Sequence, residues 1–227
     1  MLKELQLRIP KTEQLGNFNL EMKKMNRILI FALAALFLAS CGGNKDNDNT
    51  TNNPDTNQVQ NINIPQFNAD SAYAYVAAQV EFGPRVPGST AHENCAEYLI
   101  SELERHGLEV TVQEATVRTY DGTIFNGKNI IGSFDPSNTK RVMLSSHWDS
   151  RPYADWDPDP ANHRTPIPGA NDGASGVGIL LEIARLLAQS PPKIGIDIVF
   201  WDMEDYGEPH DGQNSGKEDT WGLGSQY

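Results

Sequence analysis

The sequence has few basic residues, few cysteines and no long apolar run, and each shortage excludes a class of protein. Only 18 of its 227 residues are Lys or Arg, against 30 Asp and Glu, which gives a formal net charge of −12. Proteins that bind nucleic acid need a basic surface against the phosphates, so we expect no nucleic-acid partner. Two cysteines are too few for a disulfide framework. The longest apolar run, residues 28–38, is too short to span a bilayer comfortably.

That apolar run has the flanks of an export signal. Lys23, Lys24 and Arg27 precede it, and the tetrapeptide LASC follows at 38–41. A basic segment, a short apolar segment and small residues at the cut are typical of a secretory signal. The tetrapeptide also resembles a bacterial lipobox, in which the thiol of Cys41 is acylated before cleavage. We therefore predict an exported protein that is lipid-anchored to a bacterial membrane on its periplasmic or surface side. The alternative is an ordinary signal peptide with a chance cysteine.

The composition divides the chain into three regions. Residues 1–41 contain the signal segment; acids and a proline near the beginning suit no targeting signal, so we expect translation to start at Met22 or Met25. Residues 42–66 are rich in Asn, Asp, Thr and Gln and bury too little to offset the entropy of ordering, which predicts a disordered tether. Residues 67–227 have the composition of a globular domain.

The patterns within this domain predict an α/β fold. We expect helices at 71–80, 90–106 and 177–188 and strands at 108–117, 123–132, 141–146 and 194–201. Thr90 and Glu93 have the spacing of a capping box, and Gly107 suits the end of that helix. Apolar runs separated by helices predict three layers, a twisted, mostly parallel or mixed sheet with helices on both faces. A helix joins the runs 141–146 and 194–201, so we expect them to be neighbouring central strands.

Three polar clusters lie at the ends of these elements. His147 and Asp149 follow the first of the two joined runs, Glu204 and Asp205 follow the second, and Asp172 lies in GANDGASG just before the helix. In open α/β sheets, ligands bind beyond the carboxyl ends of the strands. Taken singly, each acid is a solvated loop residue, but together with the imidazole they predict a metal site of the kind that suits zinc. Of the adjacent acids, one would bind the metal while the other moves protons.

Several segments carry a resemblance to a known family. SSHWDS, PGANDGASGVGILLEIARLL and FWDMEDYG resemble the co-catalytic zinc aminopeptidase superfamily. Within it, the chain is most similar to the zinc-dependent glutaminyl-peptide cyclotransferases, or glutaminyl cyclases, and the segments FGPRVPGSTAHENCAEYL and DTWGLGSQY strengthen this similarity. The resemblance covers roughly residues 68–227. It implies Zn²⁺ as the cofactor, peptides or proteins with an N-terminal glutamine as substrates, and conversion of that glutamine to pyroglutamate with release of ammonia.

The resemblance also assigns roles to residues. It implies that Asp172 and Asp205 are metal ligands and that Glu204 is the catalytic acid and base. His147 matches the position that holds a second zinc in the aminopeptidases and that persists in the single-zinc cyclases. The family supplies a further ligand histidine and a functional aspartate downstream of the position of Tyr227. We therefore expect a C-terminally truncated sequence whose 227 residues are inactive by themselves.

The sequence is also compatible with two other functions. One is a di-zinc aminopeptidase that hydrolyses N-terminal residues, and the other is a non-catalytic lipoprotein that binds peptides. His163 and His210 follow His147 in the chain, but both lie in polar loops and are expected to be surface residues rather than ligands. Cys95 lies on the apolar stripe of a predicted helix and is expected to be an inert core thiol.

Overall fold

The computed structural model describes residues 64–212 and 220–227. The predicted signal segment with Cys41, and all but the last three residues of the predicted tether, lie outside these ranges. No helix in the described part of the chain is long and apolar enough to cross a membrane.

The three predicted α-helices form close to their expected positions. They are α2 (Ala69–Glu81), α3 (Thr90–Arg105) and α4 (Ser175–Gln189). Gly107 follows α3 with a φ of +80°, a left-handed conformation that glycine adopts without strain, so its predicted place at the helix end is confirmed. The short helical turns η1 (Pro160–Asn162) and η2 (Ala170–Ala174) lie between β3 and α4, and η4 (Leu223–Gln226) is the last described element.

The cap of α3 differs from the prediction. Ser89, not Thr90, is the N-cap residue, and its side chain accepts the N–H of His92 at 3.1 Å. Glu93 does not return to the helix end, because it forms an ion pair with Lys128 of a neighbouring strand. The predicted capping box is therefore wrong, since the extended backbone needed at a cap occurs one residue earlier.

Four strands form one mixed sheet. They are β1 (Glu109–Arg118), β2 (Ile124–Phe134), β3 (Arg141–His147) and β4 (Gly195–Trp201), in the spatial order β1-β2-β4-β3. β2 pairs antiparallel with both β1 and β4, whereas β3 and β4 are parallel, so the predicted α/β fold with a mixed sheet is confirmed. The prediction that β3 and β4 are neighbours is also confirmed. β3 is not central among the described strands, however, because β2 takes the other side of β4 and β3 pairs with β4 alone.

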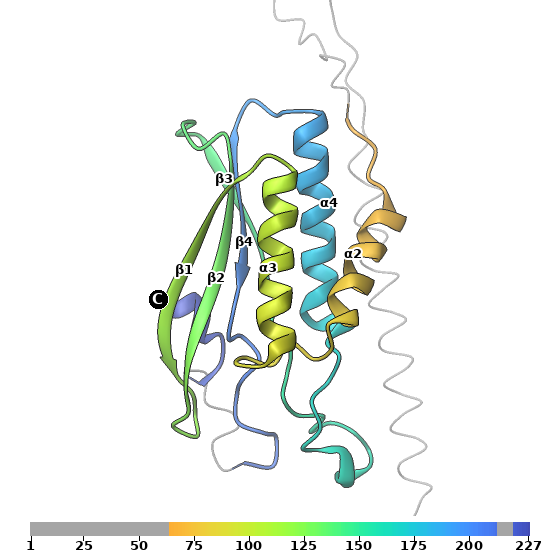
Figure 1. Cartoon of the computed structure of the whole chain (residues 1–227), viewed down its shortest axis with the longest axis vertical. Coiled ribbons are helices and arrows are strands. Elements are labelled where there is room, and N and C mark those ends of the chain that lie inside the picture. The colour runs from red at the N-terminus through yellow and green to blue at the C-terminus, as the bar shows by residue number, and fades with distance from the viewer. Residues whose placement is uncertain (1–63, 213–219) are drawn as a thin grey trace, which may run out of the picture. The chain divides into compact units, whose positions relative to one another are not determined.

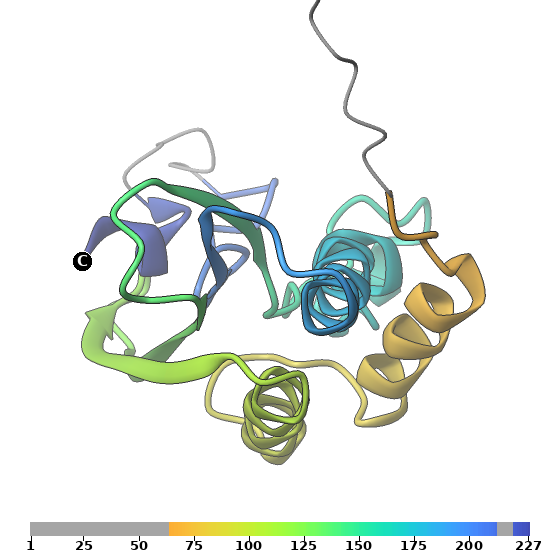
Figure 2. The same cartoon turned by 90° about the horizontal axis from the view of Figure 1, so that it is seen from above.

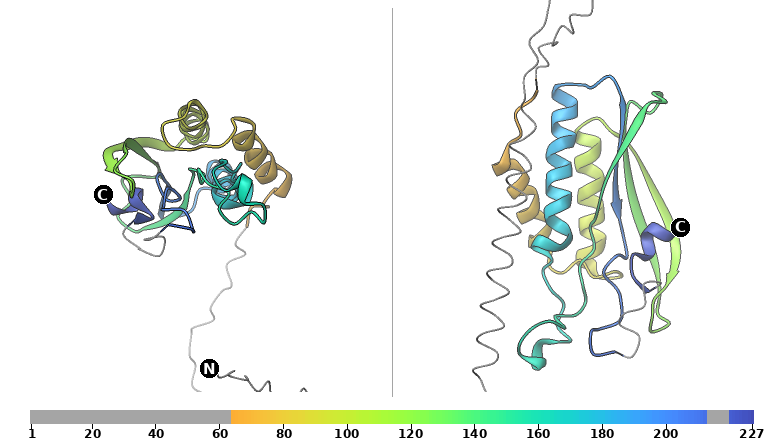
Figure 3. Two further views of the ribbon diagram at one scale, coloured as in Figure 1. Left: turned by 90° about the horizontal axis from the view of Figure 1, so that it is seen from below. Right: turned by 180° about the vertical axis from the view of Figure 1, so that it is seen from behind.

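The helices pack as layers beside the sheet. Figures 1 and 2 show α3 and α4 on the same side of the sheet, and the right panel of Figure 3 shows α2 covering the outer side of α4. All three predicted helices thus lie on one side of the sheet, and within residues 64–212 and 220–227 no α-helix covers the opposite face, where the prediction also expected helices. A core of buried side chains joins the layers, with Leu99 and Leu103 from α3, Leu181 from α4 and Phe200 from β4.

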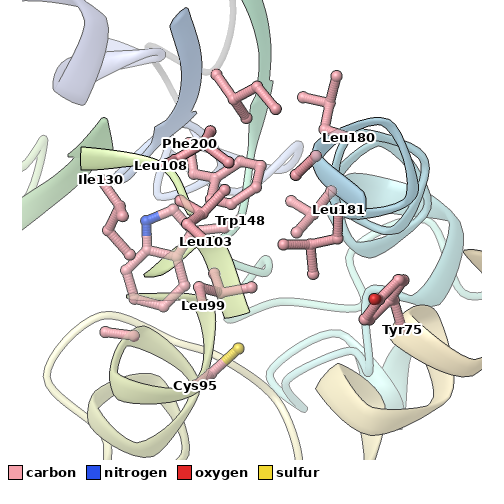
Figure 4. Close-up of a cluster of buried hydrophobic side chains, with 14 of the residues drawn as sticks. Tyr75, Cys95, Leu99, Leu103, Leu108, Ile130, Trp148, Leu180, Leu181 and Phe200 are labelled. Carbon is pink, nitrogen blue, oxygen red and sulfur yellow. The ribbon is translucent and has the colours of Figure 1, made fainter. Parts of the chain in front are cut away.

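Two further side chains lie in this core. Figure 4 shows the ring of Trp148, which is fully buried, among Leu99, Leu103 and Phe200. Cys95 is also fully buried, and burial raises the pKa of its thiol to about 12, which confirms the prediction of an inert core thiol.

Candidate active site

The parallel pairing of β3 and β4 brings two of the predicted polar clusters together. His147 is the last residue of β3 and lies opposite Trp201, the last residue of β4. The loops that follow the two strands leave the sheet at the same end, as Figure 1 shows. Glu204 and Asp205 are the third and fourth residues of the loop after β4, and Asp172 lies in η2 directly before α4.

The imidazole of His147 lies close to three carboxylates. Its Nε2 is hydrogen-bonded to Asp172 Oδ1 at 2.9 Å and its Nδ1 to Asp149 Oδ1 at 3.3 Å, while Nδ1 lies 3.8 Å from Glu204 Oε2. Ionised carboxylates only accept hydrogen bonds, so both ring nitrogens are placed as donors. Burial alone would lower the pKa of His147, but the hydrogen bond and charge of Asp149, with the charge of Glu204 and the hydrogen bond to Asp172, raise it to about 9.

Asp149 holds the loop after β4 in place. Its side chain is fully buried, and its two oxygens accept the N–H groups of Glu204 at 3.1 Å and of Asp205 at 3.0 Å. Together with its bond to His147, these contacts make Asp149 the link between the ends of β3 and β4. The sequence placed Asp149 beside His147 but gave it no role of its own.

Asp205 and Glu204 face different surroundings although they are adjacent. Asp205 is 5% exposed, and its Oδ2 is buried without a hydrogen-bond partner among the described residues. Burial first, and then the negative charges of Asp149, Asp172 and Glu204, raise the pKa of Asp205 to about 7. The Glu204 side chain is 43% exposed, and its partial burial raises its pKa as well. Asp205 is therefore the enclosed member of the pair and Glu204 the accessible one.

The residues that meet here fit zinc in their chemistry. An imidazole and several carboxylates are ligands that zinc accepts, and a buried carboxylate oxygen without a partner is a position where a cation is stabilising. Asp172 and Asp205 are the residues that would hold the ion. Within residues 64–212 and 220–227, no group of three or more His, Cys, Asp or Glu side chains stands in the arrangement of a metal site. These two acids therefore fit as ligands without forming a complete set.

The small residues around Asp172 allow β3 to approach α4 closely. A Cβ added at Gly173 would overlap the backbone oxygen of His147 and stand 2.8 Å from its ring carbon Cε1. A Cβ at Gly176 would overlap the hydroxyl of Ser146. Because these positions carry no side chain, the end of β3 rests on the start of α4, and this contact brings Asp172 to His147. Gly173 and Gly176 of GANDGASG thus have a packing role that the sequence did not reveal.

Two buried arginines, Arg85 and Arg151, support the site, and no pattern in the sequence predicted a role for either. Arg85 donates to the carbonyl oxygens of Trp148 at 3.1 Å and Gly169 at 2.9 Å, which ties the residue after His147 to the turn before η2. Arg151 makes two hydrogen bonds to Asp155, at 2.8 and 2.5 Å, and donates to the carbonyl oxygen of Asp205 at 3.0 Å. The only sign of the Arg151–Asp155 ion pair in the sequence is the spacing of four residues between an Arg and an Asp.

His163 and His210, the two histidines that follow His147 in the chain, lie in loops, as predicted. His163 Nε2 is hydrogen-bonded to the carbonyl oxygen of Asp157 at 2.8 Å. His210 is exposed, and its ring contacts that of Trp156 with a centroid separation of 4.0 Å.

The chain is similar to known proteins over most of its described part. Residues 129–227 match the model of peptidase family M28. The solved structure of a Zn-dependent exopeptidase from Parabacteroides distasonis is 62% identical, with a TM-score of 0.70, over 71% of this chain and 55% of that one. The glutaminyl cyclase of Bacteroides thetaiotaomicron bound to N-acetylhistamine is 57% identical, with a TM-score of 0.72, over 73% of this chain and 56% of that one.

A curated relative gives the other activity in its name. The aminopeptidase YwaD of Bacillus subtilis is 33% identical over 98 residues, which are 42% of this chain and 19% of that protein. The chain spans about half the length of the two solved structures and less of this relative.

These similarities confirm the resemblance to the glutaminyl cyclases within the zinc aminopeptidase superfamily, and they confirm the fold type. Zinc, the predicted cofactor, is the metal in the exopeptidase's name. The roles of His147, Asp172, Glu204 and Asp205 stay predictions that depend on the resemblance and on the geometry above.

Proposed function

We propose, from the match to peptidase family M28 and the 57% identity to a solved glutaminyl cyclase, that the complete protein is a zinc-dependent glutaminyl-peptide cyclotransferase. It would convert the N-terminal glutamine of peptides or proteins to pyroglutamate and release ammonia. The observation that carries the proposal is the convergence of His147, Asp172, Glu204 and Asp205 at the ends of β3, β4 and the start of α4, in a fold shared with that cyclase.

The reaction needs a group that moves protons beside the reacting amide. The chemistry that bound zinc supplies is polarisation of the amide carbonyl of the glutamine side chain. Glu204 would take a proton from the substrate's α-amine as the amine nitrogen bonds to the amide carbon. It then gives that proton to the amide nitrogen, the carbon–nitrogen bond breaks, and ammonia leaves without the entry of water. The Glu204 side chain suits this work because it is accessible and its pKa is raised by partial burial.

The geometry also supports a division of roles between the two adjacent acids. The N–H groups of Glu204 and Asp205 are both fixed by Asp149, so neither side chain can move far by a shift of the loop. Asp205 is enclosed and has an unpartnered oxygen, which suits a metal ligand. Glu204 has one more methylene and reaches outward, which suits proton transfer.

A di-zinc aminopeptidase is the second candidate, and it is favoured by the 62% identity to a Zn-dependent exopeptidase. His147 is the residue that would hold its second ion. Both ring nitrogens of His147 are hydrogen-bonded to carboxylates, one to Asp172 and one to Asp149.

The products of a short peptide distinguish the candidates. The complete protein, loaded with zinc, is incubated with Gln-Ala-Ala-amide, and the products are followed by mass spectrometry and an ammonia assay. The cyclase releases ammonia and leaves a peptide lighter by one ammonia, whereas Ala-Ala-Ala-amide, the control, stays intact. Release of free glutamine instead of ammonia would identify an aminopeptidase. If neither product forms, the non-catalytic peptide-binding protein is the function that remains.

We also propose that the protein is exported and held at a membrane by a lipid on Cys41. The support is the sequence alone: a basic segment, a short apolar run and the tetrapeptide LASC.

A further inference from the structure

An exposed tryptophan stands near the candidate site. Trp156 is 77% exposed, although tryptophan is on average a highly buried residue. It lies in the loop between β3 and η2, in a turn closed by the hydrogen bond from the Asp157 N–H to the Ala154 carbonyl oxygen at 2.9 Å. The ring of His210 contacts its indole from the loop after β4. A large apolar side chain is thus held outward at the end of the sheet where the site residues meet.

A pocket of about 310 Å³ lies beside this tryptophan and includes Asp172 in its wall. Trp156, Tyr153 and Ile167 give it apolar sides. The two ends of the loop, which both line the pocket, are joined by a hydrogen bond from the Ile167 N–H to the Arg151 carbonyl oxygen at 3.1 Å. The volume is at the small end of ligand pockets, so it fits a side chain rather than a whole peptide.

The charges on the pocket disfavour an acidic ligand. Asp157 and Asp172 are both in the wall, and hydrogen bonds, first the one from the Asp159 N–H, lower the pKa of Asp157. Arg151 also lines the pocket, but its guanidinium is engaged by Asp155 and by the carbonyl oxygen of Asp205. The pocket therefore combines an aromatic and aliphatic surface with negative charge and offers no free cation from Arg151.

We propose that this pocket binds the side chain of the substrate's second residue and selects peptides in which an aromatic or long aliphatic residue follows the N-terminal glutamine. The proposal rests on the proposed function, because that function places the glutamine amide at the ion held by Asp172. Consecutive residues are about 3.8 Å apart along the chain, so the neighbouring side chain reaches a pocket that shares Asp172 with the metal site. An aromatic residue gains contact with the Trp156 indole, glycine gains none, and glutamate meets the negative charge of Asp157.

The first test is selectivity. In the zinc-loaded complete protein we expect kcat/KM to be about tenfold higher for Gln-Phe-Ala-amide than for Gln-Gly-Ala-amide, and lowest for Gln-Glu-Ala-amide. In Trp156→Ala the ratio between the Phe and Gly peptides should fall to about one, and Trp156→Phe should restore part of it. Tyr73→Ala is the matched control, because Tyr73 is an equally exposed aromatic residue on α2, and it should leave the ratio unchanged.

The second test separates this inference from the proposed function. Calorimetric titration of the Glu204→Gln protein with the same peptides reads affinity without turnover, and we expect the Phe peptide to bind about tenfold more tightly than the Gly peptide. If no peptide releases ammonia but this ratio holds and is lost in the Trp156→Ala background, the cyclase function fails and the pocket stands. A ratio near one in binding and in kcat/KM, or an equal loss in Tyr73→Ala, would overturn the inference even in an active cyclase.

Discussion

Replacing Arg151 tests whether the loop after β3 is held by a buried ion pair. Arg151 and Asp155 are 7% and 5% exposed, and two hydrogen bonds of 2.8 and 2.5 Å join them. In Arg151→Met the Asp155 carboxylate stays buried and keeps the His210 N–H, 2.7 Å from its Oδ2, but it loses its cationic partner. Removal of one partner of a buried pair costs about 3–5 kcal/mol, so the free energy of unfolding should fall by that amount.

The assay is urea unfolding followed by circular dichroism, with two comparison variants. Arg164→Met is the matched control, because Arg164 pairs with Asp211 at 3.1 Å where both side chains are more than half exposed. That change should cost less than about 1 kcal/mol. In Arg151→Met/Asp155→Asn no unpaired charge is left, so about half or more of the lost stability should return. The reasoning fails if Arg151→Met costs no more than Arg164→Met, or if the double variant is no more stable than Arg151→Met alone.

The pH dependence gives an independent check on the same pair. Burial alone would raise the pKa of Asp155, but the Arg151 and His210 hydrogen bonds outweigh it and lower the pKa to about 2. The folded pKa is thus below the unfolded value of about 3.9, so the stabilisation is complete above pH ~4 and is lost as the pH falls through about 2. The difference in unfolding free energy between wild type and Arg151→Met should therefore be smaller at pH 3 than at pH 7. A difference that grows toward acid pH would contradict this assignment.

Three further changes have defined outcomes. Gly173→Ala should destabilise the fold and weaken zinc binding in the complete protein, because its Cβ overlaps His147; thermal unfolding and zinc titration would show it, and an unchanged variant would refute the packing argument. Leu181→Ala should cost about 2–5 kcal/mol in urea unfolding, since Leu181 is fully buried, while Ile179→Ala on the same helix should cost far less because Ile179 is exposed. Cys41→Ala should move the protein from the membrane fraction to the soluble fraction, and continued incorporation of labelled fatty acid into the mutant would disprove acylation at this residue.

The helices and strands were predictable to within a few residues because their patterns are local. The runs 141–146 and 194–201 are apolar, short and joined by one helix, so their parallel pairing followed from the sequence. The order of the described strands did not follow, because it depends on the hairpin of β1 and β2 taking the side of β4 opposite β3. Hydrogen bonding between distant segments decides such an order, and no local pattern records it.

The candidate site shows the same division. The positions of His147, Glu204 and Asp205 at or just after the ends of strands were predictable, because polar residues that follow an apolar run are visible in the sequence. The roles of Asp149 and Arg85 were not, since both act through hydrogen bonds to backbone atoms far along the chain. A buried charged side chain that binds backbone atoms looks the same in a sequence as a solvated one.

The measurement that tests the account most directly is zinc content beside ammonia release for two variants of the complete protein. Glu204→Gln should retain zinc and lose turnover of Gln-Ala-Ala-amide by about two to four orders of magnitude, the usual effect of removing a general base. Asp205→Asn should lose zinc affinity first, because Asp205 carries the buried, unpartnered oxygen. Zinc lost from Glu204→Gln but kept by Asp205→Asn would contradict the assignment of the two roles.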